Sequence, residues 1–254
     1  MKVARTIAEL ETAPCTGLVP TMGALHDGHR ALLAAARQEN DVLVMSLFVN
    51  PAQFDEQADL DAYPRDEASD LEIAEAQGVD IVFAPEPGEL YPPGFGTWVE
   101  PAETGAEAAA RPGHFRGVAT VCLKLFNLVQ PERAYFGQKD AQQIAVVRRL
   151  VRDLNVPVEI RVVPTVRDAD GLALSSRNRL LSSEQRTRAL ALPRALEAAA
   201  GAPDPVTAVR ASLNGLAPDY VEVLDLGDAK VLAAAVRVGS TRLIDNVLLE
   251  GEIK

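Results

Sequence analysis

The chain has 254 residues, 48% of them hydrophobic, so it can bury a large core as one substantial domain plus a smaller one. Its net charge of −11 leaves no basic surplus to replace phosphate counterions, which argues against nucleic-acid binding. Without an apolar run of roughly 18 residues or a signal-peptide core, we expect a cytoplasmic protein with no membrane contact. The two cysteines, Cys15 and Cys122, suggest neither a zinc pattern nor a disulfide framework.

The first predicted unit is a strand that turns into a helix, and the turn carries two of the three histidines of the chain. Residues 17–19 are typical of the end of a short buried strand, and apolar residues recur at helical spacing over 32–36. The motif Pro20–His29 therefore lies at a helix N-terminus, with Asp27 expected as the N-cap. Unpaired backbone N–H groups and the helix dipole favour an anion there, and we expect a phosphate chain.

Two other interpretations of the histidine pair stay open. His26 and His29 are three residues apart, a spacing that can bind zinc, but a zinc site needs further ligands and the only other histidine is His114. The second alternative is that both imidazoles cap the helix and have no chemical role. Phosphate binding is favoured because three later segments indicate related chemistry.

The second segment follows a predicted strand over 42–49. It begins at Asn50-Pro51 and includes Gln53, so two amide side chains lie just beyond the carboxyl end of a strand. Open parallel α/β sheets bind ligands at this position. A plain turn is the alternative, because Asn-Pro favours turns, but it explains Gln53 poorly.

The third segment, Tyr135–Asp140, follows a short strand and precedes a predicted helix over 143–151. Gly137 lets the backbone approach a ligand closely, and Lys139 would bring a positive charge to a phosphate. The alternative is that Lys139 is an ordinary solvated lysine.

The fourth segment, Asp170–Arg179, contains two adjacent hydroxyls followed by a guanidinium, at Ser175, Ser176 and Arg177. Such a cluster of donors suits phosphoryl oxygens. Helix capping is the alternative role for the serines. We expect Ser182-x-x-Gln185 to cap the next helix, over 187–200, which leaves Ser175 and Ser176 available.

The order of patterns along the chain predicts two domains. Strands and helices alternate from about residue 15 to 163, which indicates a mostly parallel α/β sheet over 1–164, and the run Gly117–Val129 predicts a buried helix. Beyond Pro164 come a helix, an Ala-rich link over 198–205 and three strand-like runs, which indicate a small α+β domain over 165–254. The three runs are Tyr220–Leu226, Val231–Val238 and Arg242–Leu249.

With these segments in order, the sequence resembles the pantoate–β-alanine ligase family from about residue 15 to the end. The resemblance rests on the four segments above and on Tyr63-Pro64-Arg65, Arg111-Pro112-x-His114-Phe115, Gln142-Gln143 and Thr241–Asn246. It implies a Rossmann-like nucleotidyltransferase domain, the substrates ATP, pantoate and β-alanine, Mg²⁺, and a homodimer.

The resemblance also assigns site residues. The ATP site would comprise Thr21, Met22, Gly23, Ala24, Leu25, His26, Asp27, Gly28, His29, Gly137, Gln138, Lys139, Asp140, Val166, Leu174, Ser175, Ser176 and Arg177. The charge-stabilising catalytic groups would be His26, His29, Lys139, Ser175, Ser176 and Arg177, with His29 as the proton donor.

Further positions concern the second substrate and the metal. Gln53 and Gln143 match the glutamines that hold pantoate, with Asn50 beside them, and Asp70 matches an acidic position near the metal. Gln138 stands where the family usually has Glu, so we expect that position to be peripheral.

The implied reaction is attack of the pantoate carboxylate on the α-phosphorus of ATP, which gives pantoyl adenylate and pyrophosphate. The amine of β-alanine then displaces AMP. A nucleotidyltransferase with another acceptor is disfavoured by the two glutamines. A non-catalytic nucleotide sensor is disfavoured because His29, Lys139 and Arg177 are all present.

Overall fold

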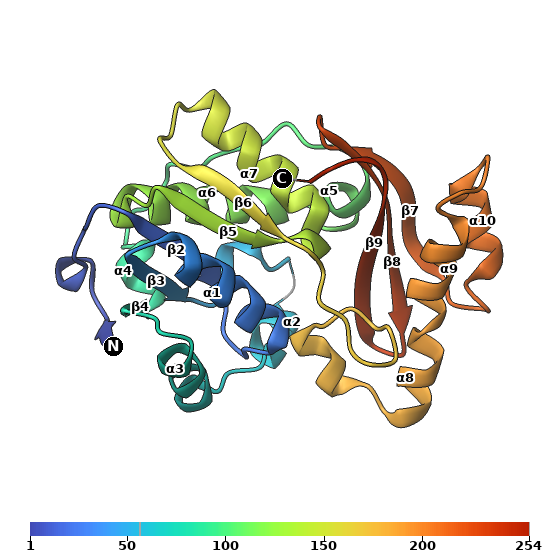
Figure 1. Ribbon diagram of the computed structural model, residues 1–254, viewed down its shortest axis with the longest axis horizontal. Helices are drawn as coiled ribbons and strands as arrows, with labels where there is room; N and C mark the ends of the chain where they lie inside the picture. Colours follow the sequence, from blue (N-terminus) through green and yellow to red (C-terminus); the bar gives the residue numbers. More distant parts are fainter. Residues whose placement is uncertain (56, 254) are drawn as a thin grey trace.

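The large sheet has six strands, all paired in parallel, in a computed structural model that describes residues 1–55 and 57–253. In spatial order the strands are β1 (Lys2–Ala4), β4 (Ile81–Phe83), β3 (Val42–Leu47), β2 (Thr16–Thr21), β5 (Arg133–Gly137) and β6 (Glu159–Val163). The parallel α/β sheet that the alternating pattern predicts is confirmed (Figure 1).

Two pairs of helices cover the two faces of this sheet, because successive strand residues point to opposite sides. Leu18 of β2 packs in the cluster under α6 (His114–Val129) and α7 (Ala141–Asp153). Its neighbour Val19 packs in the cluster under α1 (Asp27–Glu39) and α3 (Glu67–Ala76). Strands buried on both faces explain why the sequence shows continuous apolar runs there.

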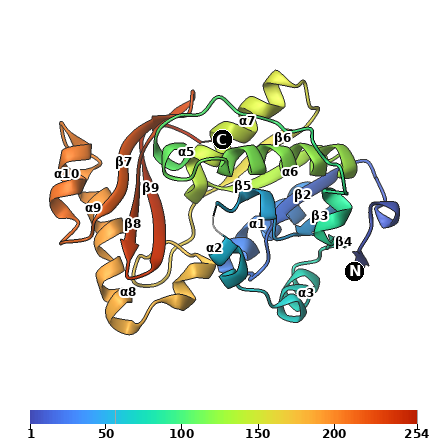
Figure 2. The same cartoon turned by 180° about the vertical axis from the view of Figure 1, so that it is seen from behind.

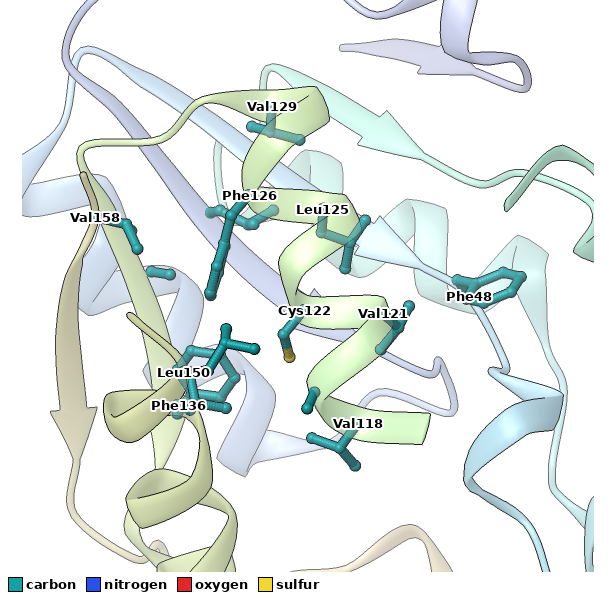
Figure 3. Close-up of a cluster of buried hydrophobic side chains, with 14 of the residues drawn as sticks. Phe48, Val118, Val121, Cys122, Leu125, Phe126, Val129, Phe136, Leu150 and Val158 are labelled. Carbon is teal, nitrogen blue, oxygen red and sulfur yellow. The ribbon is translucent and has the colours of Figure 1, made fainter. Parts of the chain in front are cut away.

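The core beneath α6 is the larger of these two clusters. Cys122 and Phe126 of α6 point toward Phe136 of β5, Leu150 and Val158 (Figure 3), and Val118 and Leu125 of the same helix belong to this cluster. The predicted buried helix over 117–129 is thus confirmed and begins three residues earlier, at His114. Cys122 is a free thiol inside this core, where it packs as a small apolar side chain.

The second sheet is antiparallel and consists of β7 (Pro218–Asp225), β8 (Ala229–Val238) and β9 (Thr241–Gly251). One of its faces carries α8 (Ser183–Ala189), α9 (Ala191–Ala199) and α10 (Pro205–Ser212), on the side away from the large sheet (Figures 1 and 2). The three predicted strand runs are confirmed within a few residues.

Two helical details differ from the prediction. The single helix expected over 187–200 is divided at Leu190 into α8 and α9, and Pro193 in the first turn of α9 disfavours a continuous helix there. The Ala-rich link is followed by an unpredicted helix, α10, whose N-cap Asp204 accepts from the Thr207 N–H at 3.1 Å. The capping box of Ser182 and Gln185 is present as expected.

Short elements connect these layers. They are the helices α2 (Gln57–Ala62), α4 (Pro87–Leu90) and α5 (Ala106–Ala110), and the 3₁₀ turns η1 (Ile7–Glu9), η2 (Pro51–Gln53), η3 (Gln138–Asp140) and η4 (Ser176–Leu180). Within 1–55 and 57–253, no helix is both long and apolar enough for a membrane span.

The segment around α5 precedes the predicted boundary near 164 but packs against the second sheet. Arg242 of β9 donates two hydrogen bonds to the Glu107 carboxylate, at 2.7 and 3.0 Å, and Glu222 accepts from the Ala106 N–H at 3.0 Å. The last strand of the large sheet ends at Val163. The boundary at 164 stays a prediction. Residue 254, the last of the predicted second domain, lies outside the described residues.

Gly117 lies where α6 passes the backbone of η2. A Cβ at Gly117 would lie 2.2 Å from the Ala52 carbonyl oxygen and 2.6 Å from the Gln53 nitrogen. Because backbone atoms leave no room, Gly117→Ala should lower the free energy of unfolding by about 1–3 kcal/mol and displace η2. Urea denaturation measures this, with Gly88→Ala as the control, since a Cβ at Gly88 meets no atom within 4 Å. Equal stability of the two variants would contradict this packing.

Candidate active site between the two sheets

A cavity of about 600 Å³ lies between the carboxyl ends of the central strands and the second sheet. Its position follows from topology. The chain moves from β2 to β3 on one side, and β5 later pairs with β2 on the other side. Loops that leave β2 and β5 therefore diverge, and such a reversal of strand order is where open α/β sheets bind ligands.

Most of the predicted site residues line this cavity. They are Thr21, Met22, His26, Gly28, His29, Asn50, Gln53, Gly137, Lys139, Asp140, Gln143, Val166, Leu174, Ser175, Ser176 and Arg177. Six others are not in its lining, namely Gly23, Ala24, Leu25, Asp27, Asp70 and Gln138. The four segments that are distant in sequence thus meet at one place.

The two histidines cap α1 and each other. His26, not Asp27, is the N-cap, because its Nδ1 accepts the Gly28 N–H at 3.1 Å. His29 Nδ1 accepts the His26 N–H at 3.3 Å, which completes a capping box. Asp27 is the first helical residue and forms an ion pair with Arg30 at 3.3 Å. The expectation that Asp27 is the N-cap was wrong because an imidazole takes that role.

The caps determine which nitrogen of each ring carries the proton. Since both Nδ1 atoms accept hydrogen bonds, the neutral rings carry their protons on Nε2. Burial, followed by the nearby positive charge of Lys139, lowers the pKa of His26 to about 4. Burial, followed by His26 and Lys139, lowers the pKa of His29 to about 3. Both rings are neutral at pH 7 and offer Nε2–H donors at the cavity.

Asp70 holds the loop that precedes α1. Its carboxylate accepts from the Ala24 N–H at 2.9 Å and from the Leu25 N–H at 2.7 Å. Gly23 and Ala24 have φ values of 81° and 50°, so the chain turns sharply there and aims both N–H groups at one acceptor. Asp70 is buried, and a role for it beside a metal stays a prediction.

Lys139 enters the cavity from η3, directly after β5. Its ammonium lies 4.0 Å from the Asp140 carboxylate, and its side chain is 20% exposed. Its charge acts on both imidazoles, which places Lys139 near the N-terminus of α1. The adjacent Gln138 was expected to be peripheral, but its amide donates to Asn246 of the second sheet at 3.4 Å.

The hydroxyl pair and Arg177 reach the cavity from the start of η4, in the C-terminal part of the chain. Ser175 Oγ accepts the Arg177 N–H at 3.3 Å and caps η4, so this serine has a capping role after all. Ser176 is buried. Burial raises the pKa of Tyr63, and Ser176 lowers it less strongly. The Arg177 guanidinium donates to Asp59 at 3.2 Å, with 29% of its side chain exposed.

Asn50 and Gln53, the two amides that follow β3, lie in and beside η2. Asn50 caps this turn and donates to the Gly117 carbonyl and to Gln53 Oε1, both at 3.1 Å. The Tyr91 hydroxyl donates to Asn50 Oδ1 at 2.9 Å. All polar atoms of the Asn50 side chain therefore have partners, so the turn interpretation explains Asn50 well. The Gln53 amide is aimed at the Met22 sulfur, 2.9 Å away.

Sequence reasoning assigned no role to the residues that hold Gln53. His114 Nδ1 donates to the Gln53 carbonyl at 2.9 Å, and Arg111 donates to the same oxygen at 3.1 Å. Burial, then the positive charge of Arg111, lowers the pKa of His114 to about 4, so this ring is neutral as well. The sequence signal for Arg111 and His114 was the Arg-x-x-His spacing at the start of a helix. Nothing in the neighbouring sequence links that spacing to Gln53.

The neighbouring glutamines of α7 have different surroundings. Gln142 is buried and accepts from the Glu107 N–H at 2.9 Å, so it joins α7 to α5. Gln143 lines the cavity, and its side chain makes no hydrogen bond within the described part of the chain. Its amide is therefore free for a ligand.

Comparison with known proteins gives one family. A family model described as pantoate–β-alanine ligase matches residues 2–248. The pantothenate synthetase of Chloroflexus aurantiacus is 54% identical over 281 residues and is covered fully, as is this chain. The pantothenate synthetase of a Roseiflexus species is 52% identical over 278 residues, which cover 98% of this chain and 100% of that protein.

Solved structures agree. The pantothenate synthetase of Thermus thermophilus superposes with a TM-score of 0.93 at 44% identity, covering 98% of this chain and 99% of the other. The pantoate–β-alanine ligase of Francisella tularensis, described as complexed with β,γ-ATP and β-alanine, has a TM-score of 0.86 at 35% identity, covering 99% of both chains. The chain belongs to the pantoate–β-alanine ligase family.

Proposed function

We propose that this chain joins pantoate to β-alanine at the expense of ATP, through a pantoyl-adenylate intermediate that releases pyrophosphate and then AMP. The observation that carries the proposal is that hydrogen-bond donors suited to phosphate and two glutamine amides line one cavity. Neutral imidazoles, Lys139 and the Ser175–Arg177 cluster line the same space as Gln53 and Gln143.

The phosphate donors support the first step. His26 and His29 offer Nε2–H groups beside the N-terminus of α1, where the helix dipole favours an anion. Lys139 and Arg177 are positively charged donors that line the cavity together with these neutral imidazoles. Groups fixed in this way stabilise the charge that develops on the α-phosphate and on the departing pyrophosphate, which is the main contribution a protein makes to such transfers.

The amides support the choice of acceptor. Pantoate carries a carboxylate and hydroxyl groups, and amide side chains both donate and accept hydrogen bonds. The Gln143 amide is free, and the Gln53 backbone is fixed by His114 and Arg111, so the pair forms a stable recognition surface. A nucleotide sensor that performs no chemistry has no need of this second, uncharged surface.

We propose that Mg²⁺ enters with ATP and is held mainly by its phosphates. No group of three or more His, Cys, Asp or Glu residues suited to a metal occurs in residues 1–55 and 57–253. Of the cavity carboxylates, Asp59 is paired with Arg177 and Asp140 lies near Lys139. Mg²⁺ is commonly bound by one or two carboxylates plus substrate phosphates, which fits Asp140 or Asp59 as a single protein ligand. The ion would offset phosphate charge during attack.

The second step needs an enclosed adenylate. The cavity is bounded by the large sheet on one side and by residues of β8 and β9 on the other, so water has restricted access to an intermediate held there. A homodimer is the assembly that the family resemblance implies, and light scattering of the purified chain measures it. The cytoplasm is the location that we expect from the sequence.

The exchange of labelled pyrophosphate into ATP tests this function. With Mg²⁺, ATP and pantoate but no β-alanine, the chain should catalyse the exchange, because adenylate formation is complete before the amine is needed. Omission of pantoate should abolish it, and the full reaction should yield AMP. Production of ADP, or exchange without pantoate, would overturn the proposal.

Removal of Lys139 tests the charge-stabilising role. Lys139→Ala should lower the turnover number by about 10²–10³-fold, the range for loss of one preorganised stabiliser. Its thermal midpoint should stay near that of the native chain, because Lys139 makes one weak ion pair. Lys230→Ala, which removes an exposed lysine of the second sheet, is the control and should retain full turnover. Comparable turnover of both variants would refute the assignment.

The neutral histidines make stability depend on pH. The His26 pKa is about 4 when folded and near 6.5 when unfolded, so between these values the unfolded chain binds more protons. Stability should therefore fall as pH decreases from about 6.5 toward 4. His26→Asn keeps an N-cap oxygen and should lose less stability between pH 7 and pH 5, as measured by urea denaturation. A steeper decline in the variant would show that His26 is not neutral when folded.

A further inference from the structure

The segment Thr241–Asn246 of β9 is prominent in the sequence, yet no role in the reaction has been assigned to it. It lies on the second sheet, more than 60 residues beyond the Ser175–Arg177 loop and about 100 beyond Lys139. Its last two residues, Asp245 and Asn246, are both 2% exposed, although both are polar. Buried polar side chains need partners, and here the partners are the two phosphate-binding loops.

Asn246 holds the loop that carries Lys139. Its Nδ2 donates to the carbonyl oxygens of Gln138 and Lys139, both at 3.0 Å. Its Oδ1 accepts from the Gln138 amide at 3.4 Å. All three contacts reach η3, so one buried amide of the second sheet holds this single turn. A turn of three residues has few internal hydrogen bonds, and its orientation depends on such outside partners.

Asp245 holds the hairpin that leads to Ser175. Its carboxylate accepts two hydrogen bonds from Arg167, at 2.7 and 3.0 Å, and Arg167 also donates to the Gly171 carbonyl at 3.2 Å. The hairpin is closed by the Leu174 N–H, which donates to the Val166 carbonyl at 3.0 Å. Ser175 follows directly.

The contacts of Asn246 with η3 and those of Asp245 with Arg167 are connected by a hydrogen bond between these two neighbouring residues. The Asn246 N–H donates to Asp245 Oδ1 at 2.8 Å, so the carboxylate that binds Arg167 is itself oriented by the residue that binds η3. A continuous series of hydrogen bonds therefore runs from the Lys139 backbone through β9 to the loop of Ser175. Both ends of this series line the cavity.

We propose that Asp245 and Asn246 are positioning residues that fix Lys139 relative to the Ser175–Arg177 cluster. Both residues also line the cavity, but their side-chain polar atoms are used in the contacts with η3 and the 166–174 hairpin, so they act through these two loops. The inference rests on the proposed function, because the two loops are taken to bind the same polyphosphate. Misplacement of a stabilising group by about 1 Å can cost about 10²-fold in rate, so such fixing matters for catalysis.

The first experiment separates rate and binding effects. In the pyrophosphate exchange assay, Asn246→Ala should lower the maximal rate by about 10–100-fold and raise the KM for ATP, with the KM for pantoate changed less than about 2-fold. Asp245→Asn should act in the same direction because it weakens the bidentate contact with Arg167. Unchanged kinetics in Asn246→Ala would overturn the proposal.

A control distinguishes positioning from general contact between the two sheets. Asp228 in the β7–β8 turn forms an ion pair with Arg148 of α7 at 3.0 Å, and neither residue belongs to the cavity lining. Asp228→Ala removes a contact between the same two parts of the chain and should leave all constants unchanged. If Asp228→Ala reproduces the effect of Asn246→Ala, the contact is merely structural and the proposal fails.

Two further measurements remain informative even if a variant is destabilised. If Asn246 acts through Lys139, the rate loss caused by Asn246→Ala should be much smaller in the Lys139→Ala background than in the native chain. Additive rate losses would contradict the proposal. Hydrogen exchange of the unliganded chain should show faster exchange over 137–143 in Asn246→Ala, with α9 unchanged. If the unsubstituted chain instead exchanges pyrophosphate into ATP without pantoate, the proposed function itself fails. The two failures are thus distinguishable.

Discussion

The reciprocal hydrogen bonds between His26 and His29 at the start of α1 are the interaction on which the candidate site depends. Each imidazole uses Nδ1 for the backbone, so each ring is fixed, neutral and left with one N–H donor. Capping and anion binding, which are alternatives when the sequence is read alone, are therefore compatible here. The cap is what makes the donors available, because it determines both the tautomer and the ring orientation.

The loop that leads into this cap is under a second constraint. It turns through two residues of positive φ, and the Asp70 carboxylate takes the N–H groups that this turn exposes. Burial raises the pKa of Asp70, while the two N–H donors lower it, with burial the larger effect. Asp70 therefore affects the site indirectly, by holding the backbone of this loop. A small shift of α3, which carries Asp70, would move the backbone that leads to His26.

The second sheet completes the site by charged contacts rather than by an extensive apolar interface. Arg242 of β9 contacts Glu107, Glu222 of β7 accepts from the Ala106 N–H, and a small apolar cluster around Tyr220 joins α5 to the sheet. Such buried pairs add little net stability but allow few alternative arrangements, because an unpaired charge in the same place would be costly. The relative placement of the two parts is therefore specific, which suits a cavity lined from both sides.

The sequence by itself determined the features that depend on neighbours along the chain. Apolar runs and helical spacing predicted the parallel sheet, α6 and the three late strands, and the capping box at Ser182 marked the start of α8. The residue types of four segments were enough to indicate phosphate chemistry. Tertiary structure decided the rest: that His26 replaces Asp27 as N-cap, that Asn50 is satisfied by Gly117 and Tyr91, and that Asn246 fixes the Lys139 loop. The physical reason is that these hydrogen bonds join partners brought together by strand order and by the docking of the second sheet, which leave no periodic signal in the sequence.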